Sequence, residues 1–150
     1  MFCVMDSPVG RLHITAQDGC ITGVDRTNLP LVPAHDPLLQ DCVRQLSEYF
    51  ARQRTVFDLP LCLNGTSFRQ RVWAELMRIP YGTVISYGEM ARRIGQPGAS
   101  RAVGGANHAN PVCIIVPCHR VISADGTLGG YGGGLDMKAR LLQLEGVLLP

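Results

Sequence analysis

Cys118 and His119 are adjacent residues whose types could carry out nucleophilic chemistry. They follow the apolar run 112–116, which predicts a buried strand that ends at Pro117. Reactive side chains are commonly found where a buried strand gives way to a loop. A cysteine attacks as its thiolate, and a neighbouring imidazole can accept the thiol proton directly or through water. The pair indicates a cysteine nucleophile, although a Cys-His dipeptide alone is weak evidence.

The second ring nitrogen of His119 needs a partner that fixes its tautomer. A carboxylate from elsewhere in the fold would serve, and Glu145 is a candidate. The glycine-rich segment 129–134 is a different kind of feature, because it lacks the Lys-Ser/Thr ending of a phosphate-binding loop. We interpret it as a mobile flap or as a turn at which the backbone makes a close approach.

Two short helices across a tight turn are predicted ahead of the cysteine. Ser86 and Glu89 fit a capping box at the start of the first, residues 95–98 break it, and residues 99–106 begin the second. This is the outline of a helix-turn-helix. The second helix exposes mostly Ala and Gly, which offer base edges few hydrogen bonds. Such a bare face fits close, sequence-neutral approach to the minor groove, and it fits tight packing inside a core equally well.

The elements that must hold these residues indicate an α+β protein in two parts. Residues 11–15 and 20–24 have the pattern of strands, and the apolar residues of 37–52 recur at helical spacing. Residues 59–65 look like a link, after which Thr66 or Ser67 can cap a helix that ends before Pro80. We expect an N-terminal sheet-plus-helix domain at 1–63 and a C-terminal helical domain at 64–150 with the helix-turn-helix and the cysteine.

Composition limits the class of protein. Of 150 residues, 46% are apolar, which is enough to bury a core, and no apolar run is long enough to span a bilayer. The N-terminus does not resemble a signal peptide, so we expect a cytoplasmic protein without a membrane partner. The six cysteines are then expected to be reduced thiols, most of them small buried apolar residues. No Cys-x-x-Cys pair or zinc-finger histidine spacing occurs, so we predict no metal.

Charge is spread unevenly along the chain. Residues 1–64 carry five Arg and seven acidic residues, whereas residues 65–150 carry nine basic and five acidic residues. A basic C-terminal half is suited to contact with a polyanion. Ordinary solvated charge explains the same numbers and would be preferred on this evidence alone.

Several motifs taken together resemble one family. Residues 117–121, Pro-Cys-His-Arg-Val, are similar to the active-site motif of the O6-alkylguanine-DNA alkyltransferases, also called methylated-DNA–protein-cysteine methyltransferases. The segments 79–87, 100–107, 110–111, 130–134 and 142–146 resemble further motifs of that family in the same order. The resemblance is strong from 66 to 146 and weaker before it, where 6–10 and 49–50 are the best anchors.

The resemblance implies direct repair of DNA. Cys118 would take the alkyl group irreversibly from O6-alkylguanine, and from O4-alkylthymine, with a single turnover and no cofactor. His119, through water to the thiol and with Glu145 behind it, would form the thiolate. Tyr87 would push the damaged nucleotide out of the stack and protonate the departing guanine. The partner would be alkylated double-stranded DNA, bound in the minor groove with little sequence specificity by a monomer of the stand-alone bacterial type.

Further roles follow from the same resemblance. Arg101 would fill the space that the extruded nucleotide leaves, and Asn110 would be a hinge between the recognition helix and the active-site segment. The other residues implied at the DNA are Ser100, Ala102, Gly104, Gly105 and Asn107, and those implied at the substrate pocket are Val121, Tyr131, Gly132 and Gly133. His108 is a candidate phosphate contact or an ordinary solvated side chain. Cys113 and Gly132 are small, which predicts tolerance of adducts bulkier than methyl.

Three other functions compete with this hypothesis. A lesion-binding alkyltransferase-like protein would keep the helix-turn-helix but lack the nucleophile, and Cys118 argues against it. A transcription regulator would need base readout that the bare helix does not offer. A cysteine hydrolase would need an oxyanion hole and repeated turnover.

Overall fold

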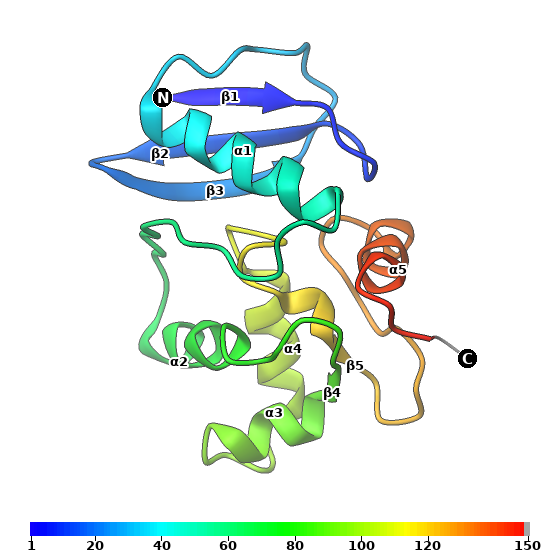
Figure 1. Cartoon of the computed structure of the whole chain (residues 1–150). Helices are drawn as coiled ribbons and strands as arrows, with labels where there is room; N and C mark the ends of the chain where they lie inside the picture. The colour runs from blue at the N-terminus through cyan, green and yellow to red at the C-terminus, as the bar shows by residue number, and fades with distance from the viewer. Residues whose placement is uncertain (149–150) are drawn as a thin grey trace. The chain divides into compact units, whose positions relative to one another are not determined.

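The computed structural model describes residues 1–148, which form two compact units (Figure 1). The first unit comprises residues 1–63 and 111–115, and the second comprises 64–110 and the chain from 116 onward. The first contains a small antiparallel sheet with one helix and the second is mainly helical, so the α+β class is confirmed. Residues 111–115 pack with the first unit, whereas the sequence assigned them to the C-terminal part.

The sheet of the first unit has the order β1-β2-β3, formed by Phe2–Met5, Leu12–Gln17 and Cys20–Arg26. Asp18 and Gly19 both have positive φ, of 52° and 80°, which closes β2 and β3 into a tight hairpin. The two predicted strands are therefore confirmed, and both are longer than the sequence indicated. Strand β1 was not predicted, because its pattern is too short to separate from an irregular N-terminus.

Helix α1, Pro37–Phe50, covers the sheet as the sequence predicted (Figure 1). The Asp36 carboxylate caps it by accepting hydrogen bonds from the backbone of Leu38 and Leu39. Its apolar face is buried, and the residues of that face are Leu39, Cys42, Leu46 and Tyr49. The predicted helix ran to residue 52, but Arg52 has a φ of 59°, which is incompatible with continuing the helix.

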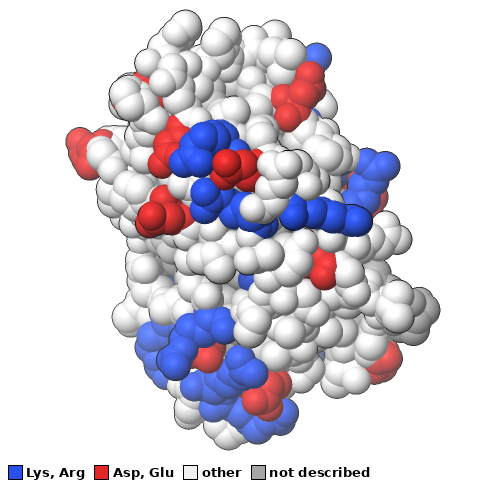
Figure 2. Space-filling model, viewed as in Figure 1, with Lys and Arg blue, Asp and Glu red and all other residues white. Residues whose placement is uncertain are grey.

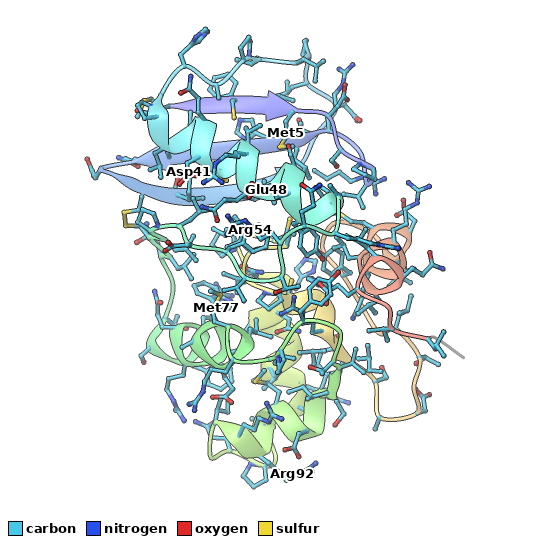
Figure 3. The ribbon with its side chains drawn as sticks, viewed as in Figure 1. Met5, Asp41, Glu48, Arg54, Met77 and Arg92 are labelled. Atoms are coloured by element: carbon cyan, nitrogen blue, oxygen red, sulfur yellow. A yellow bond between two sulfur atoms is a disulfide. The ribbon has the colours of Figure 1, made fainter. Side chains whose placement is uncertain are left out.

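The chain after α1 is fastened to the helix by side chains. The buried amide of Gln45 donates to Asp58 O at 2.9 Å and accepts from Asp58 N at 2.8 Å. Arg54 reaches back to Glu48, with 2.9 Å between Nε and Oε1 (Figure 3). These contacts bring residues 60–62 alongside β3, where Ile21 and Leu61 form a parallel bridge.

The expectation that all six cysteines are reduced thiols is wrong, because Cys20 and Cys62 form a disulfide. The bridge between Ile21 and Leu61 places the Cα atoms of the neighbouring Cys20 and Cys62 5.5 Å apart, a distance that a disulfide spans. The partners are 42 residues apart in sequence, so no local pattern indicated the pair. Cys3, Cys42, Cys113 and Cys118 are thiols outside any disulfide, and Cys3 and Cys42 are the buried apolar residues that the sequence predicted.

The strand predicted for 112–116 is also wrong. Only Val112 pairs, in a parallel bridge with Val24, and the chain then turns at Ile114, whose φ is 73°. The run is buried as expected, since Val112, Ile114 and Val116 are each no more than 1% exposed. Burial alone produced the continuous apolar pattern, so the pattern did not require extended backbone.

The second unit is built from four helices and a short parallel pair of strands. The helices are α2 (Ser67–Leu76), α3 (Tyr87–Arg93), α4 (Ser100–His108) and α5 (Leu135–Leu144). Strand β4 (Ile85–Ser86) pairs with β5 (Val121–Ile122), and a 3-10 turn, η1, spans Cys118–Arg120. α3 and α4 form the predicted helix-turn-helix, and α2 and α3 pack against α4 (Figure 1).

Two side-chain caps fix where α2 and α3 begin. Thr66 Oγ1 accepts from Arg69 N at 3.2 Å, and Ser86 Oγ accepts from Glu89 N at 3.0 Å. Both predicted helix starts are confirmed. Trp73 then joins α2 to α4, because its indole Nε1 donates to Ala106 O at 2.8 Å inside the core.

None of the helices within residues 1–148 combines the length and apolar character that a membrane span requires. In the same residues, no three His, Cys, Asp or Glu side chains gather as metal ligands would. The absence of a metal stays a prediction of the sequence.

Candidate active site

Cys118 begins η1 and lies at a pocket of about 410 Å³ within the second unit. The residue is 6% exposed, so its thiol is reached through the pocket rather than from open solvent. The wall is formed by α3, α4 and the glycine-rich segment, with the lining residues Tyr87, Ser100, Arg101, Gly104, Asn107, His108, Cys118, Ser123, Gly129, Gly130, Tyr131 and Gly132. The cysteine is therefore the nucleophile that this pocket offers to a bound molecule.

Asn110 holds the cysteine. Its Nδ2 donates to Cys118 Sγ at 3.2 Å and to Val116 O at 2.9 Å. Burial raises the pKa of the Cys118 thiol, while the hydrogen bonds from Asn110 and Tyr131 and the charge of Lys138 act to lower it. Burial dominates, so the thiol is protonated in the resting protein and a base is needed to form the thiolate.

His119 and Glu145 form a buried pair directly behind the cysteine. His119 Nε2 lies 2.7 Å from Glu145 Oε2, and both side chains are fully inaccessible to solvent. Burial lowers the pKa of His119, against an opposing contribution from Glu145. The neutral imidazole therefore donates from Nε2 to the carboxylate, which leaves Nδ1 as a proton acceptor. Nδ1 makes no hydrogen bond to any described residue.

Glu145 also binds the residue after His119. Arg120 donates from Nε to Oε1 at 2.9 Å and from Nη2 to Oε2 at 3.0 Å, and its Nη1 donates to Ile79 O at 2.7 Å. Gly82 N donates to Oε1 at 3.1 Å. The guanidinium balances the charge of the buried carboxylate and fixes its orientation toward His119. Sequence analysis gave Arg120 no role, because an Arg in such a motif is equally compatible with an exposed side chain.

Tyr87 lines the pocket at the start of α3. Burial raises the pKa of its hydroxyl, and a backbone hydrogen bond from Gly130 partly opposes that effect. A Cβ atom at Gly129, whose φ is +71°, would lie 2.9 Å from the Tyr87 hydroxyl oxygen. The glycine-rich segment is thus a close-approach turn over Tyr87, one of its two interpretations, and its mobility stays a prediction.

Helix α4 has one face in the core and one open face, so its packing in a core is confirmed and its approach to the minor groove stays a prediction. Val103 and Ala106 are buried in the core, while Arg101, Ala102 and Gly105 are exposed. A Cβ at Gly104 or Gly105 would meet nothing within 4 Å, so the bare face is open. Ser100, Arg101, Gly104 and Asn107 line the pocket, whereas Ala102 and Gly105 lie outside it on the exposed part of the helix.

The residues predicted for the substrate pocket divide into walls and supports. Tyr131 and Gly132 line the pocket, and Val121 is buried in β5. Gly133 packs so closely that a Cβ there would lie 2.7 Å from Met137 Sδ. Cys113 belongs to the first unit, where its Sγ donates to Val24 O at 3.0 Å, and it is not among the described residues that line the pocket. Cys113 is therefore not placed at the pocket as expected, whereas tolerance of adducts bulkier than methyl stays a prediction.

Sequence reasoning missed Lys138 at this site. Lys138 is fully buried on α5, and its Nζ donates to backbone carbonyls of β5 and of the pocket segment. Its neighbours Met137, Leu141 and Leu142 are the apolar face of the helix. No local signal distinguishes a buried lysine from one that extends to solvent at the edge of such a face. Ser123, Gly129 and Gly130 also line the pocket without having been predicted individually.

Basic side chains gather over α2 and α3 of the second unit (Figure 2). Arg92 and Arg93 at the end of α3 pair with Glu89, and Arg78 pairs with Glu75 across 3.8 Å. Most of this charge is therefore partly neutralised. Arg101 on α4 is exposed and lines the pocket, and it forms no ion pair with the described residues.

The second unit thus combines a helix-turn-helix with a pocket that holds a buried cysteine and a His–Glu pair behind it, which is the arrangement of a protein with a nucleophilic cysteine beside a helix-turn-helix. The family model of the DNA-binding domain of 6-O-methylguanine DNA methyltransferase matches residues 67–147, and that of its ribonuclease-like domain matches residues 2–63. The chain belongs to the 6-O-methylguanine DNA methyltransferase family.

Individual relatives agree over nearly the whole chain. A methylated-DNA–protein-cysteine methyltransferase of Mycobacterium tuberculosis is 49% identical over 94% of this chain and 89% of its own. One from Methanosarcina acetivorans is 42% identical over 97% of each chain. The crystal structure of M. tuberculosis OGT in complex with DNA has a TM-score of 0.88, at 49% identity over 96% of this chain and 91% of that one.

Proposed function

We propose that this protein repairs DNA by moving the alkyl group of O6-alkylguanine, and of O4-alkylthymine, onto Cys118 in one irreversible turnover. The observation that carries the proposal is the buried thiol at a pocket whose wall includes the bare helix of a helix-turn-helix. Family membership and the DNA complex of the M. tuberculosis relative support the choice of substrate.

Activation of the thiol begins at His119. The neutral imidazole presents Nδ1 as the acceptor, and Glu145 stabilises the imidazolium that forms when it takes the proton. We propose that a water molecule carries the proton from Cys118 to Nδ1. Asn110 and Tyr131 then stabilise the thiolate through hydrogen bonds.

Transfer is an in-line displacement at the alkyl carbon. A sulfur lone pair forms the S–C bond while the C–O6 bond breaks and its electrons pass to the purine. Tyr87 supplies a proton to the departing base, so no anion is expelled into a largely desolvated pocket. The product is a thioether, which has no easy reverse reaction, and each protein molecule therefore acts once without a cofactor.

The DNA-facing role falls to α4. Its open glycines permit close approach of the backbone to the minor groove, and few side chains there can read base edges. Arg101 lies at the pocket rim, where it can enter the space vacated by an extruded nucleotide. Alkylation at O6 weakens pairing, so extrusion costs less for the lesion than for normal guanine. We further propose that the protein binds duplex DNA as a monomer and with little sequence specificity.

Intact-mass measurement after incubation with duplex DNA containing O6-methylguanine tests the function. The protein should gain the mass of one methyl group, on Cys118, and Cys118→Ser should gain none. Tyr87→Phe should keep its affinity for the duplex but transfer the methyl group roughly 10²-fold more slowly, within the range for loss of one proton donor. Methylation of the Cys118→Ser variant would refute the assignment.

A lesion-binding protein without transfer activity is the alternative outcome. It would bind O6-methylguanine duplex more tightly than undamaged duplex while its mass stays constant. If the protein neither binds the lesion nor gains mass, the cysteine hydrolase becomes the hypothesis to test. Repeated turnover of a thioester substrate would support it.

A further inference from the structure

Lys138 is a buried lysine for which the transfer chemistry above has no role. Its side chain is fully enclosed by the second unit. The ammonium group donates to Val121 O at 2.7 Å, to Gly130 O at 3.1 Å and to Leu128 O. All three of its protons are used on carbonyls, and no carboxylate of the described residues forms an ion pair with it. Burying a cation without a counter-ion costs stability, so the segments that its three hydrogen bonds hold together indicate what Lys138 contributes.

The three carbonyls belong to the frame of the pocket. Val121 lies in β5 immediately after η1, and Leu128 and Gly130 flank Gly129. Gly129 and Gly130 line the pocket, and a Cβ atom at Gly129 would lie 2.9 Å from the Tyr87 hydroxyl oxygen. One ammonium group therefore ties α5 to the segment that covers Tyr87 and to the strand that follows the nucleophile.

The charge of Lys138 also acts on the reacting groups. Its Nζ lies 5.8 Å from the centroid of the Tyr87 ring. The positive charge lowers the pKa of both Cys118 and His119, and a Cys118 thiolate in turn raises the pKa of Lys138. Burial has the larger effect and brings the pKa of Lys138 from 10.5 down to about 8. The side chain is therefore still mostly cationic at pH 7.

We propose that Lys138 is a positioning residue of the transfer reaction, whose ammonium group holds residues 128–130 over Tyr87 and places a positive charge beside the reacting groups of the pocket. This inference rests on the proposed function for its biological meaning. Its two parts depend on geometry and charge that exist without DNA, so they can be tested on the protein alone.

Three substitutions separate charge from packing. Lys138→Met removes the charge and the donors, Lys138→Gln keeps an amide donor without charge, and Lys138→Arg keeps the charge. Gln143→Met, at an exposed position on the same helix, is the matched control. Circular dichroism and thermal unfolding establish which variants fold. Should Lys138→Met fail to fold, Lys138→Gln and Lys138→Arg carry the same comparison.

Alkylation of Cys118 by iodoacetamide, followed by peptide mass mapping from pH 6 to 10, gives the first readout. Lys138→Met and Lys138→Gln should react about tenfold more slowly at pH 7, which corresponds to a rise of one unit in the pKa of the thiol. Lys138→Arg and Gln143→Met should react like the wild type. The groups facing the thiol, Tyr87, Tyr131, Asn110 and His119, are the same in every variant.

The second readout is the single-turnover rate on O6-methylguanine duplex. In the wild type, the rate should stop rising above about pH 8, where Lys138 loses its charge. In Lys138→Arg it should keep rising as the thiolate fraction grows. The affinity for duplex should be unchanged in all variants, because Lys138 is buried.

The two proposals fail in different ways. If the wild type accepts no methyl group, the proposed function fails, while the iodoacetamide comparison still decides the role of Lys138. If folded Lys138→Met or Lys138→Gln shows the wild-type pH profile toward iodoacetamide, the inference about Lys138 is overturned, whatever the outcome with DNA. A slower reaction accompanied by an equal loss of DNA affinity would also overturn it.

Discussion

Asn110 donates hydrogen bonds to the sulfur of Cys118 at 3.2 Å and to the carbonyl of Val116 at 2.9 Å from a single carboxamide nitrogen. The chain leaves the second unit after residue 110 and returns to it at residue 116. The side chain of Asn110 therefore joins the two ends of the segment 111–115 and also contacts the candidate nucleophile.

Replacing Asn110 by alanine should weaken both functions of that contact. The Val116 carbonyl loses one of its two hydrogen bonds and keeps the one from Cys118 N, so we expect the free energy of unfolding to fall by about 0.5–1.5 kcal/mol. The Cys118 thiol loses a hydrogen bond that lowers its pKa, so its reaction with iodoacetamide at pH 7 should slow. Urea unfolding and peptide mass mapping measure the two effects. A variant that is destabilised but reacts at the wild-type rate would show that Asn110 acts on the fold alone.

Stability should depend on pH through His119. Burial places the pKa of this histidine below its ordinary value of 6.5, so the unfolded chain takes up a proton at a pH where the folded protein does not. The contribution is fully present above pH 6.5 and is lost as the pH falls below it. The urea midpoint should therefore decrease between pH 7 and pH 5, and His119→Gln should flatten that decrease. His35→Gln, at an exposed histidine, should leave it unchanged.

Gly105→Ala should separate helix stability from DNA binding. A Cβ at this position meets nothing within 4 Å, and alanine is favoured over glycine inside a helix by about 1 kcal/mol. The variant should therefore be more stable to urea than the wild type. The added methyl group lies on the exposed face proposed to approach the minor groove, so affinity for duplex DNA should fall. Unchanged affinity in fluorescence anisotropy would move the DNA interface away from this part of α4.

The Cys20–Cys62 disulfide should be visible both as a thiol count and as stability. Thiol titration of the protein, unfolded without reductant, should find four reactive cysteines rather than six. Closing a loop of this length restricts the unfolded chain, so Cys62→Ser should lower the free energy of unfolding by up to about 4 kcal/mol. Cys42→Ala, at a free buried cysteine, controls for ordinary loss of packing. Six titratable thiols would contradict the disulfide.

The sequence by itself determined the parts that depend on local patterns. Neighbouring residues are enough to predict three such features. These are the helix caps at Thr66 and Ser86, the helical spacing of 37–50 and the motif around Cys118. Those patterns identified the two-part α+β fold and the family, and they proposed Glu145 as the partner of His119. That pairing could be proposed because the motif around each residue was recognisable, although the two lie 26 residues apart.

Only the tertiary structure decided the features that depend on distant partners. The disulfide requires β3 to lie against residues 60–62, and the turn at Ile114 follows from packing rather than from its apolar neighbours. Lys138 is buried because carbonyls from β5 and residues 128–130 converge on its Nζ. A sequence records which residues favour burial and which local backbone they adopt. Which polar atoms meet in the interior is fixed when separate segments pack together.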